Sequence, residues 1–266
     1  MIMKLRHATI ALISTFALLT AAGCYNPFVP KLAPNVGVSE VAPTPNSVRG
    51  LLDLFSWCYN NRAYDEYTEL FTDDFQFQFS VADTTGQAFG ERGLFRQDEL
   101  DTARHLFIEG TATEPPAQKI VLTFDRTFIP EPDSRPGKTY PVHQEIKRNV
   151  VLSIDTGDQA FRITGAARFF VVRGDSAKIP PDLVQRGFGP DKNRWYIERW
   201  EDETLDTGAG LIAQAGGATA MKQAIAVALA REGTTATRTI TAPAAATGTT
   251  TTYGVTWGWL QAYYLP

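Results

Sequence analysis

The sequence predicts an α+β fold in which helices pack on one face of a mainly antiparallel sheet. Apolar side chains recur at helical spacing in three segments between Ser47 and Glu109. Four strand-like segments follow between residues 119 and 200. Helices first and a run of antiparallel strands afterwards are typical of an α+β domain. The hydrophobic fraction of 44% is large enough to form its core.

Residues 1–23 have the features of an export signal. Lys4 and Arg6 precede an apolar run over residues 8–22. A run of about 15 residues is short for a membrane span, which needs about 20, and is typical of a secretory signal peptide. The run ends in Ala21-Ala22-Gly23-Cys24, which resembles the lipobox of bacterial lipoproteins. The resemblance implies that Cys24 is lipidated and begins the mature protein. The alternative is an ordinary signal peptide whose cleavage site happens to precede a cysteine.

A lipid on Cys24 would anchor the protein to a membrane of the cell envelope. The absence of aspartate after it, where Tyr25 stands, favours the outer membrane if the host has two membranes. Residues 24–46 form a Pro-rich segment without helical or strand period, which is typical of an extended tether. Cys58 would then have no intramolecular disulfide partner, and we expect it to be a buried core residue.

The helices are predicted in the first half of the chain. The first helix begins after a cap at Asn46 or Ser47. Its apolar stripe comprises Val48, Leu51, Leu52, Phe55, Cys58 and Tyr59. A second helix is predicted over residues 62–71 and a third over residues 98–109. Between them, phenylalanine alternates with glutamine over residues 74–80, which predicts a strand with one buried face.

Four further strands and a tail of different character complete the chain. The strands are predicted over residues 119–129, 144–154, 161–172 and 194–200. We therefore place the folded domain at residues 47–203. Residues 204–266 form a low-complexity tail rich in Ala, Gly and Thr, with aromatic residues at its C-terminal end.

The aromatic end of the tail predicts a short helix. Trp257, Leu260 and Tyr264 would share one face of it. Two interpretations remain open. The helix docks back on its own domain, or it contacts a partner or a membrane.

Charge and composition exclude several functions. A net charge of −4 lacks the basic footprint of a nucleic-acid binder. The three histidines, His7, His105 and His143, do not form a typical zinc site, so we predict no metal and no cofactor. His105 lies one helical turn from Asp101, and we expect the two to form a solvated ion pair.

One stretch resembles a known superfamily. Tyr59-Asn60-Asn61-Arg62-Ala63-Tyr64-Asp65-Glu66-Tyr67 leads to Leu70-Phe71-Thr72-Asp73-Asp74-Phe75. This pattern is similar to the start of domains in the nuclear transport factor two superfamily, which includes ketosteroid isomerases and polyketide cyclases. The resemblance covers residues 47–203. It implies a cone-shaped fold in which three N-terminal helices cover the concave face of a curved sheet and leave a pocket between them.

The sequence lacks the reactive side chains of the isomerases at the matching positions. The positions that match the isomerases' oxyanion-stabilising tyrosine and catalytic aspartate are Phe55 and Phe79. An isomerase needs a carboxylate that moves the proton and a donor that stabilises the enolate, and phenylalanine supplies neither. Tyr59, one turn from Phe55, is either a substitute donor or a core residue with its hydroxyl at the rim.

Three arginines share the alternation phase of the apolar residues on three predicted strands. They are Arg126, Arg148 and Arg199. If the phase holds, all three point toward the helix-covered face, where a buried guanidinium needs a carboxylate, a ligand or water. They would then form a pocket for an anionic ligand. The alternative is that they lie at the rim of the sheet, or that a bulge reverses the phase.

These observations predict an envelope-anchored lipoprotein with a non-catalytic cone domain. The domain would bind a small apolar or anionic ligand or an envelope protein, with Arg126, Arg148, Arg199 and Tyr59 as candidate binding residues. The first alternative is an enzyme of the same superfamily, of the isomerase, dehydratase or cyclase kind, that uses non-standard residues. The second is a homodimer formed through the outer face of the sheet.

Overall fold

The computed structural model describes residues 41–80, 83, 89, 93–157, 159–204 and 251–265. All of them belong to one compact unit, residues 39–266. The predicted signal peptide, Cys24 and most of the tether lie outside the described residues, as does the low-complexity stretch 205–250.

Eight strands form one sheet in the part of the chain that the structure describes. They are β1 (Phe71–Gln78), β2 (Leu94–Phe95), β3 (Lys119–Phe124), β4 (Glu131–Pro132), β5 (His143–Asp155), β6 (Gln159–Arg173), β7 (Trp195–Asp202) and β8 (Thr251–Gly254). The order is β2-β1-β7-β6-β5-β3, with β4 paired to β5 and β8 paired to β6. All pairs are antiparallel except β1 with β7 and β6 with β8.

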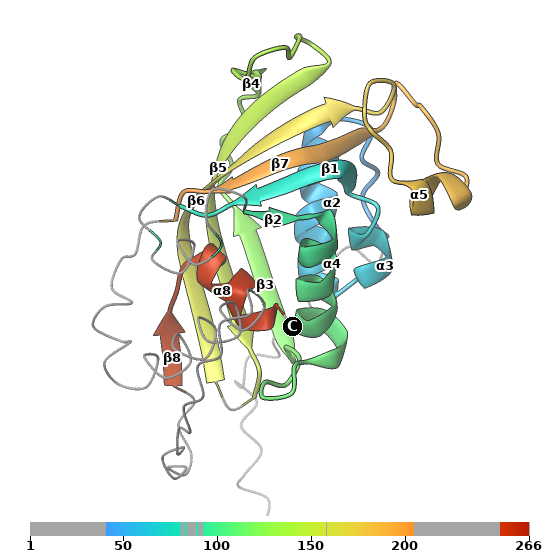
Figure 1. The fold of residues 1–266 in the computed structure, drawn as a ribbon. Coiled ribbons are helices and arrows are strands. Elements are labelled where there is room, and N and C mark those ends of the chain that lie inside the picture. The colour runs from blue at the N-terminus through green and yellow to red at the C-terminus, as the bar shows by residue number, and fades with distance from the viewer. Residues whose placement is uncertain are drawn as a thin grey trace, which may run out of the picture. The chain divides into compact units, whose positions relative to one another are not determined.

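The helices cover one face of this curved sheet (Figure 1). They are α2 (Val48–Asn61), α3 (Tyr64–Tyr67), α4 (Arg96–Arg104) with a π-helical continuation (His105–Glu109), and α8 (Trp257–Tyr264). A further short helix, α5 (Pro181–Gln185), packs through Leu183 into a small separate cluster with Val172 and Tyr196. The predicted α+β fold, with N-terminal helices on the concave face of a mainly antiparallel sheet, is confirmed.

The local predictions hold at the start of α2, but two predicted elements end early, and the strand predicted over residues 119–129 is only Lys119–Phe124 of β3. Ser47 caps α2, because its hydroxyl accepts the amide hydrogen of Gly50 at 3.0 Å. The helix predicted over residues 62–71 is only the single turn α3, and β1 begins at Phe71. The amide of Ile197 donates to the carbonyl of Leu70, so pairing with β7 takes this backbone into the sheet.

The interior between helices and sheet is filled with aromatic rings. The ring of Phe55 contacts those of Tyr59, Tyr67, Phe124, Phe169, Trp200 and Trp257. We call the space around these rings the cone interior. Cys58 is fully buried beside it, and burial raises the pKa of its thiol, which confirms the expected core role.

The C-terminal segment is part of this interior. Strand β8 runs parallel to Gln159–Arg162 of β6, whereas β7 pairs with β6 only over Ala167–Arg173. β8 therefore extends the sheet where β7 does not reach. All residues of α8 are buried, and the rings of Trp257 and Trp200 meet edge to face at 4.3 Å. Of the two interpretations of the aromatic tail, the structure shows docking on its own domain, so the folded core extends past residue 203 to include residues 251–265.

Truncation of Trp257 tests this packing. Trp257→Ala should lower the free energy of unfolding by about 3–5 kcal/mol, because it leaves a cavity among the rings of the cone interior. Urea denaturation of the full chain measures the change. The control Ile129→Ala, at a side chain that is 65% exposed, should cost less than about 0.5 kcal/mol. Equal effects of the two substitutions would contradict a buried Trp257.

Candidate functional site

A buried carboxylate lies in the cone interior. Glu99 of α4 is fully buried. Its Oε1 accepts the hydroxyl hydrogen of Tyr67 at 2.6 Å, and its Oε2 accepts from Nε2 of Gln261, on α8, at 2.8 Å. Desolvation raises the pKa of Glu99 to about 7, because both hydrogen bonds only partly replace the lost water. The two oxygens of Glu99 thus join α3, α4 and α8.

Tyr59, a candidate binding residue, lies in the same interior. Its hydroxyl accepts from the indole N–H of Trp257 at 3.4 Å. Its ring packs edge to face against Tyr67, Phe107 and Trp257, at centroid distances of 5.2–5.7 Å. Burial raises the pKa of Tyr59, so the hydroxyl stays protonated. The contact partner of Tyr59 is therefore a segment of its own chain.

A second buried carboxylate holds the N-terminal end of α8. Asp202, at the end of β7, accepts the amide hydrogen of Gly258 at 2.8 Å. It also accepts from the hydroxyl of Thr204 at 2.6 Å. Desolvation raises the pKa of Asp202 to about 6. The free amides at a helix N-terminus favour a negative charge, so Asp202 suits this end of α8.

Phe79 and Asp83 leave room for only a glycine at position 258. The carboxylate of Asp83 accepts the hydroxyl hydrogen of Thr256 at 2.7 Å. A Cβ at Gly258 would lie 2.6 Å from Oδ2 of Asp83 and 2.7 Å from Cδ1 of Phe79. The backbone of α8 can approach these side chains closely because residue 258 has no Cβ. Phe79 thus lies close to the backbone of α8 at Gly258.

His105 holds the C-terminal end of α8. Its Nδ1 lies 3.0 Å from the carbonyl oxygen of Tyr264, so the ring donates to that carbonyl. The expected ion pair with Asp101 is wrong, since the carboxylate of Asp101 accepts from Nε2 of Gln97 instead. The π-helical turn begins at His105, and the half-buried imidazole satisfies one of the last carbonyls of α8.

Of the three arginines, only Arg148 lies on the inner face of the sheet. It is 5% exposed, and its register partner Ala167 belongs to the main core. Its Nε donates to a carboxylate oxygen of Asp125 at 3.0 Å. Its guanidinium carbon lies 5.1 Å from the ring centroid of Phe124. The charge is thus balanced by a side chain of the loop after β3.

Arg126 and Arg199 lie elsewhere. β3 ends at Phe124, so Arg126 falls in the following bend and is exposed. A bulge in β7 leaves Glu198 without a partner on β6, because Phe170 pairs with Arg199 and Val171 pairs with Ile197. This extra residue turns Arg199 to the outer face, where it forms an ion pair with Glu201 at 2.8 Å. The structure therefore does not bring the three arginines together.

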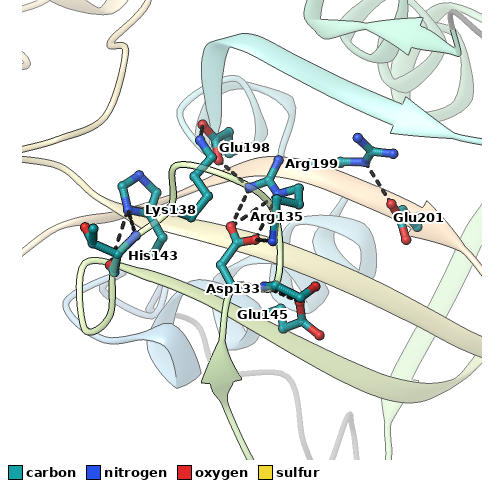
Figure 2. A network of polar contacts seen from close by, with 10 residues as sticks. Asp133, Arg135, Lys138, His143, Glu145, Glu198, Arg199 and Glu201 are labelled. Atoms are coloured by element: carbon teal, nitrogen blue, oxygen red, sulfur yellow. Dashed lines mark hydrogen bonds and ion pairs between the residues drawn. The ribbon is translucent and has the colours of Figure 1, made fainter.

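The outer face carries a network of ion pairs (Figure 2). Arg135 contacts the carboxylates of Asp133, at 2.6 Å, and Glu198, at 2.5 Å. Lys138 also contacts Glu198. The guanidinium of Arg135 stacks on the ring of Phe170, with 4.4 Å between its carbon and the ring centroid. These contacts fasten the segment between β4 and β5 to the sheet, and leave the bulge residue Glu198 paired.

An open groove lies at the ends of β1 and β7. Its volume is about 890 Å³, and it is lined among others by Phe79, Lys147, Glu201 and Glu203. Lys147 forms an ion pair with Glu203 at its edge. Among the described residues, no group of His, Cys, Asp or Glu side chains could hold a metal ion, and no helix is long and apolar enough to cross a membrane.

Glu99, Asp202 and Gln261 were not predicted from the sequence, although each of them carries a signal. Glu99 precedes Ala103 and Leu106 by four and seven residues, so it lies on the buried face of its helix. Asp202 shares the alternation phase of Trp200. A carboxylate at a position where the helix or strand periodicity predicts an apolar residue thus indicates a buried polar site. Gln261 follows Trp257 by four residues and precedes Tyr264 by three, so it lies on the apolar face of its predicted helix.

No family model and no curated protein matches this chain. Three solved structures illustrate the fold neighbours. A protein from Novosphingobium aromaticivorans whose name suggests a scytalone dehydratase is 12% identical, with 59% of this chain and 81% of that chain covered and a TM-score of 0.40. An NTF2-like protein with a cystatin-like fold from the same organism is 15% identical, with 62% and 84% covered and a TM-score of 0.34.

The third neighbour is the beta subunit of the benzoate 1,2-dioxygenase from Burkholderia mallei. It is 14% identical, with 60% of this chain and 89% of that chain covered and a TM-score of 0.39. The neighbours thus include NTF2-like domains and an enzyme subunit. At these values the likeness assigns no function to this chain.

The buried Glu99 predicts a pH-dependent stability. Its pKa is about 7 in the folded chain and near its ordinary value of 4.5 in the unfolded chain, so folding takes up a proton between these pH values. The free energy of unfolding should therefore fall as the pH rises from about 4.5 to about 7. A pKa difference of this size corresponds to a total decrease of about 3 kcal/mol in the free energy of unfolding. Asp202 adds a smaller loss that ends near pH 6.

Glu99→Gln isolates the contribution of Glu99. Oε1 of Gln261 has no hydrogen-bond partner among the described residues, so it can accept from the new amide. The variant should lose most of the decline between pH 6 and 7 in urea denaturation curves. The control Glu131→Gln, on the exposed strand β4, should leave the decline unchanged. An unaltered decline in Glu99→Gln would show that Glu99 is not its source.

The positions of Arg148 and Arg199 predict that replacing them lowers the free energy of unfolding by different amounts. Arg148→Met should lower the free energy of unfolding by about 1–3 kcal/mol, because Asp125 loses the partner of a largely buried pair. Arg199→Met should cost only about 0–1 kcal/mol, since Arg199 and Glu201 are both partly solvated. Chemical denaturation of both variants measures the difference. A larger cost at Arg199 would contradict the placement of these side chains on opposite faces.

Proposed function

We propose that this protein is a lipid-anchored envelope protein whose cone domain binds a partner or ligand and catalyses no reaction. The single observation that carries the proposal is the position of α8 in the cone interior. Trp257 and Tyr264 are fully buried there, in the space where the superfamily resemblance implies a pocket. While α8 occupies this space, no room is left there for a substrate.

The groups in the interior support a binding role. Both oxygens of Glu99 accept hydrogen bonds from protein donors, Tyr67 and Gln261. A general base needs hydrogen-bond reach to a substrate proton, and Glu99 is fully buried with α8 packed against it. Phe55 and Phe79 occupy the two positions where the isomerases place their reactive groups. The interior therefore serves packing and recognition of α8.

An enzyme remains the second candidate, and one observation favours it. Glu99 has a pKa of about 7 and lies beside Tyr67, a combination suited to proton transfer near neutral pH. Such chemistry would require α8 to leave the interior. The purified full chain should give no turnover with isomerase, dehydratase or cyclase substrates. Turnover that disappears in Glu99→Gln would overturn the non-catalytic proposal.

The lipid anchor rests on the residues before and at Cys24. Cys24→Ser removes the thiol that would carry the lipid, so the protein should move from the membrane fraction to the soluble fraction in a bacterium that processes lipoproteins. Fractionation followed by immunoblotting measures this. The control Cys58→Ala alters the buried cysteine and should leave the protein with the membranes. Continued sedimentation of Cys24→Ser with membranes would refute the anchor.

A further inference from the structure

The contacts of α8 have the form of a bound peptide. Residues 203–250 separate the end of β7 from β8, which directly precedes α8 in the chain. Each part of the segment meets a different element of the domain. β8 adds a strand to β6, and Trp257 inserts between Trp200 and Tyr59. Strand addition and an apolar helix in a groove are both recurring modes of peptide recognition.

Polar contacts define the direction and register of this segment. Asp202 binds the amide of Gly258 at the N-terminal end of α8, and His105 binds the carbonyl of Tyr264 at the other end. Glu99 binds the side-chain amide of Gln261 between them. The contacts of Asp202 and His105 are to backbone atoms, so they fix the direction and position of a helix of any sequence. The contact of Glu99 is to a side chain, so a segment without a carboxamide at this position would leave the buried carboxylate without one of its donors.

We propose that the cone interior is a peptide-binding site, and that residues 251–265 occupy it as a tethered, exchangeable ligand. The class of ligand is an extended segment followed by a short aromatic helix that carries a carboxamide. This inference rests on the proposed binding function and names its ligand class. Tethering makes the docking intramolecular, so a free peptide competes poorly while the connection is intact. Cutting the connection removes this advantage.

The test uses the full chain with a protease recognition sequence inserted between Ala236 and Thr237. After cleavage of the folded protein, the C-terminal fragment should remain bound at micromolar concentration in size-exclusion chromatography. A fluorescent synthetic peptide of residues 251–266 should then exchange into the cut protein and raise its anisotropy saturably. The uncut protein should take up at least tenfold less peptide at the same concentration.

Variant peptides test the recognition contacts. Trp257→Ala in the peptide should weaken binding at least about 100-fold, as for a central buried anchor. Gln261→Leu should weaken it about tenfold, because Glu99 then loses a donor. A peptide of the same composition in scrambled order is the control and should not bind.

Two results would overturn the proposal. If the cut protein keeps its circular dichroism spectrum but admits no labelled peptide, the segment is a permanent part of the core. If cleavage alone unfolds the protein, the segment is needed for folding and is not a ligand. Either result leaves the Cys24 fractionation and the turnover assays untouched. Failure of the peptide-binding site is therefore distinguishable from failure of the proposed function.

Discussion

The packing of the domain interior depends on the edge-to-face contact between the rings of Trp257 and Trp200. Trp200 belongs to β7 and Trp257 to α8, so the contact joins the last part of the chain to the middle of the sheet. Around it, the rings of Phe55, Tyr59 and Phe169 close the interior. Aromatic pairs of this geometry add to the gain from burying their area. Without the indole of Trp257, the rings on α2 and the sheet would face an empty or water-filled space.

Filling the interior with aromatic rings has an electrostatic consequence. Glu99 and Asp202 lose water when α8 is in place, and desolvation raises the pKa of each. Both carboxylates also hold α8 through hydrogen bonds. The segment that desolvates these groups is therefore the segment they bind. Burying these two carboxylates lowers the free energy of unfolding at neutral pH. Their hydrogen bonds in turn fix the position and direction of α8.

The sheet separates two charged regions with different solvation. Arg148 lies inside, against Asp125 and Phe124, whereas Arg199 lies on the outer face near Arg135. One extra residue, Glu198, causes this separation, because a bulge shifts the alternation of β7 by one position. Arg135 and Lys138 both pair with Glu198, so the bulge residue is also the anchor of the outer network (Figure 2).

The sequence by itself determined the elements whose signal is local. The stripe from Val48 to Tyr59, the cap at Ser47 and the alternation along β5 and β6 follow from the side chains of one segment each. The periodicity of Trp257, Leu260 and Tyr264 likewise predicted a helix with one apolar face. It did not predict where in the domain this helix packs. Only the tertiary structure decided that α8 enters the cone interior, that β1 begins at Phe71, and that Arg199 faces outward. Each of these features depends on a partner that is distant in sequence. Such partners decide burial, strand pairing and bulges. Periodicity, in contrast, is a property of neighbours along the chain.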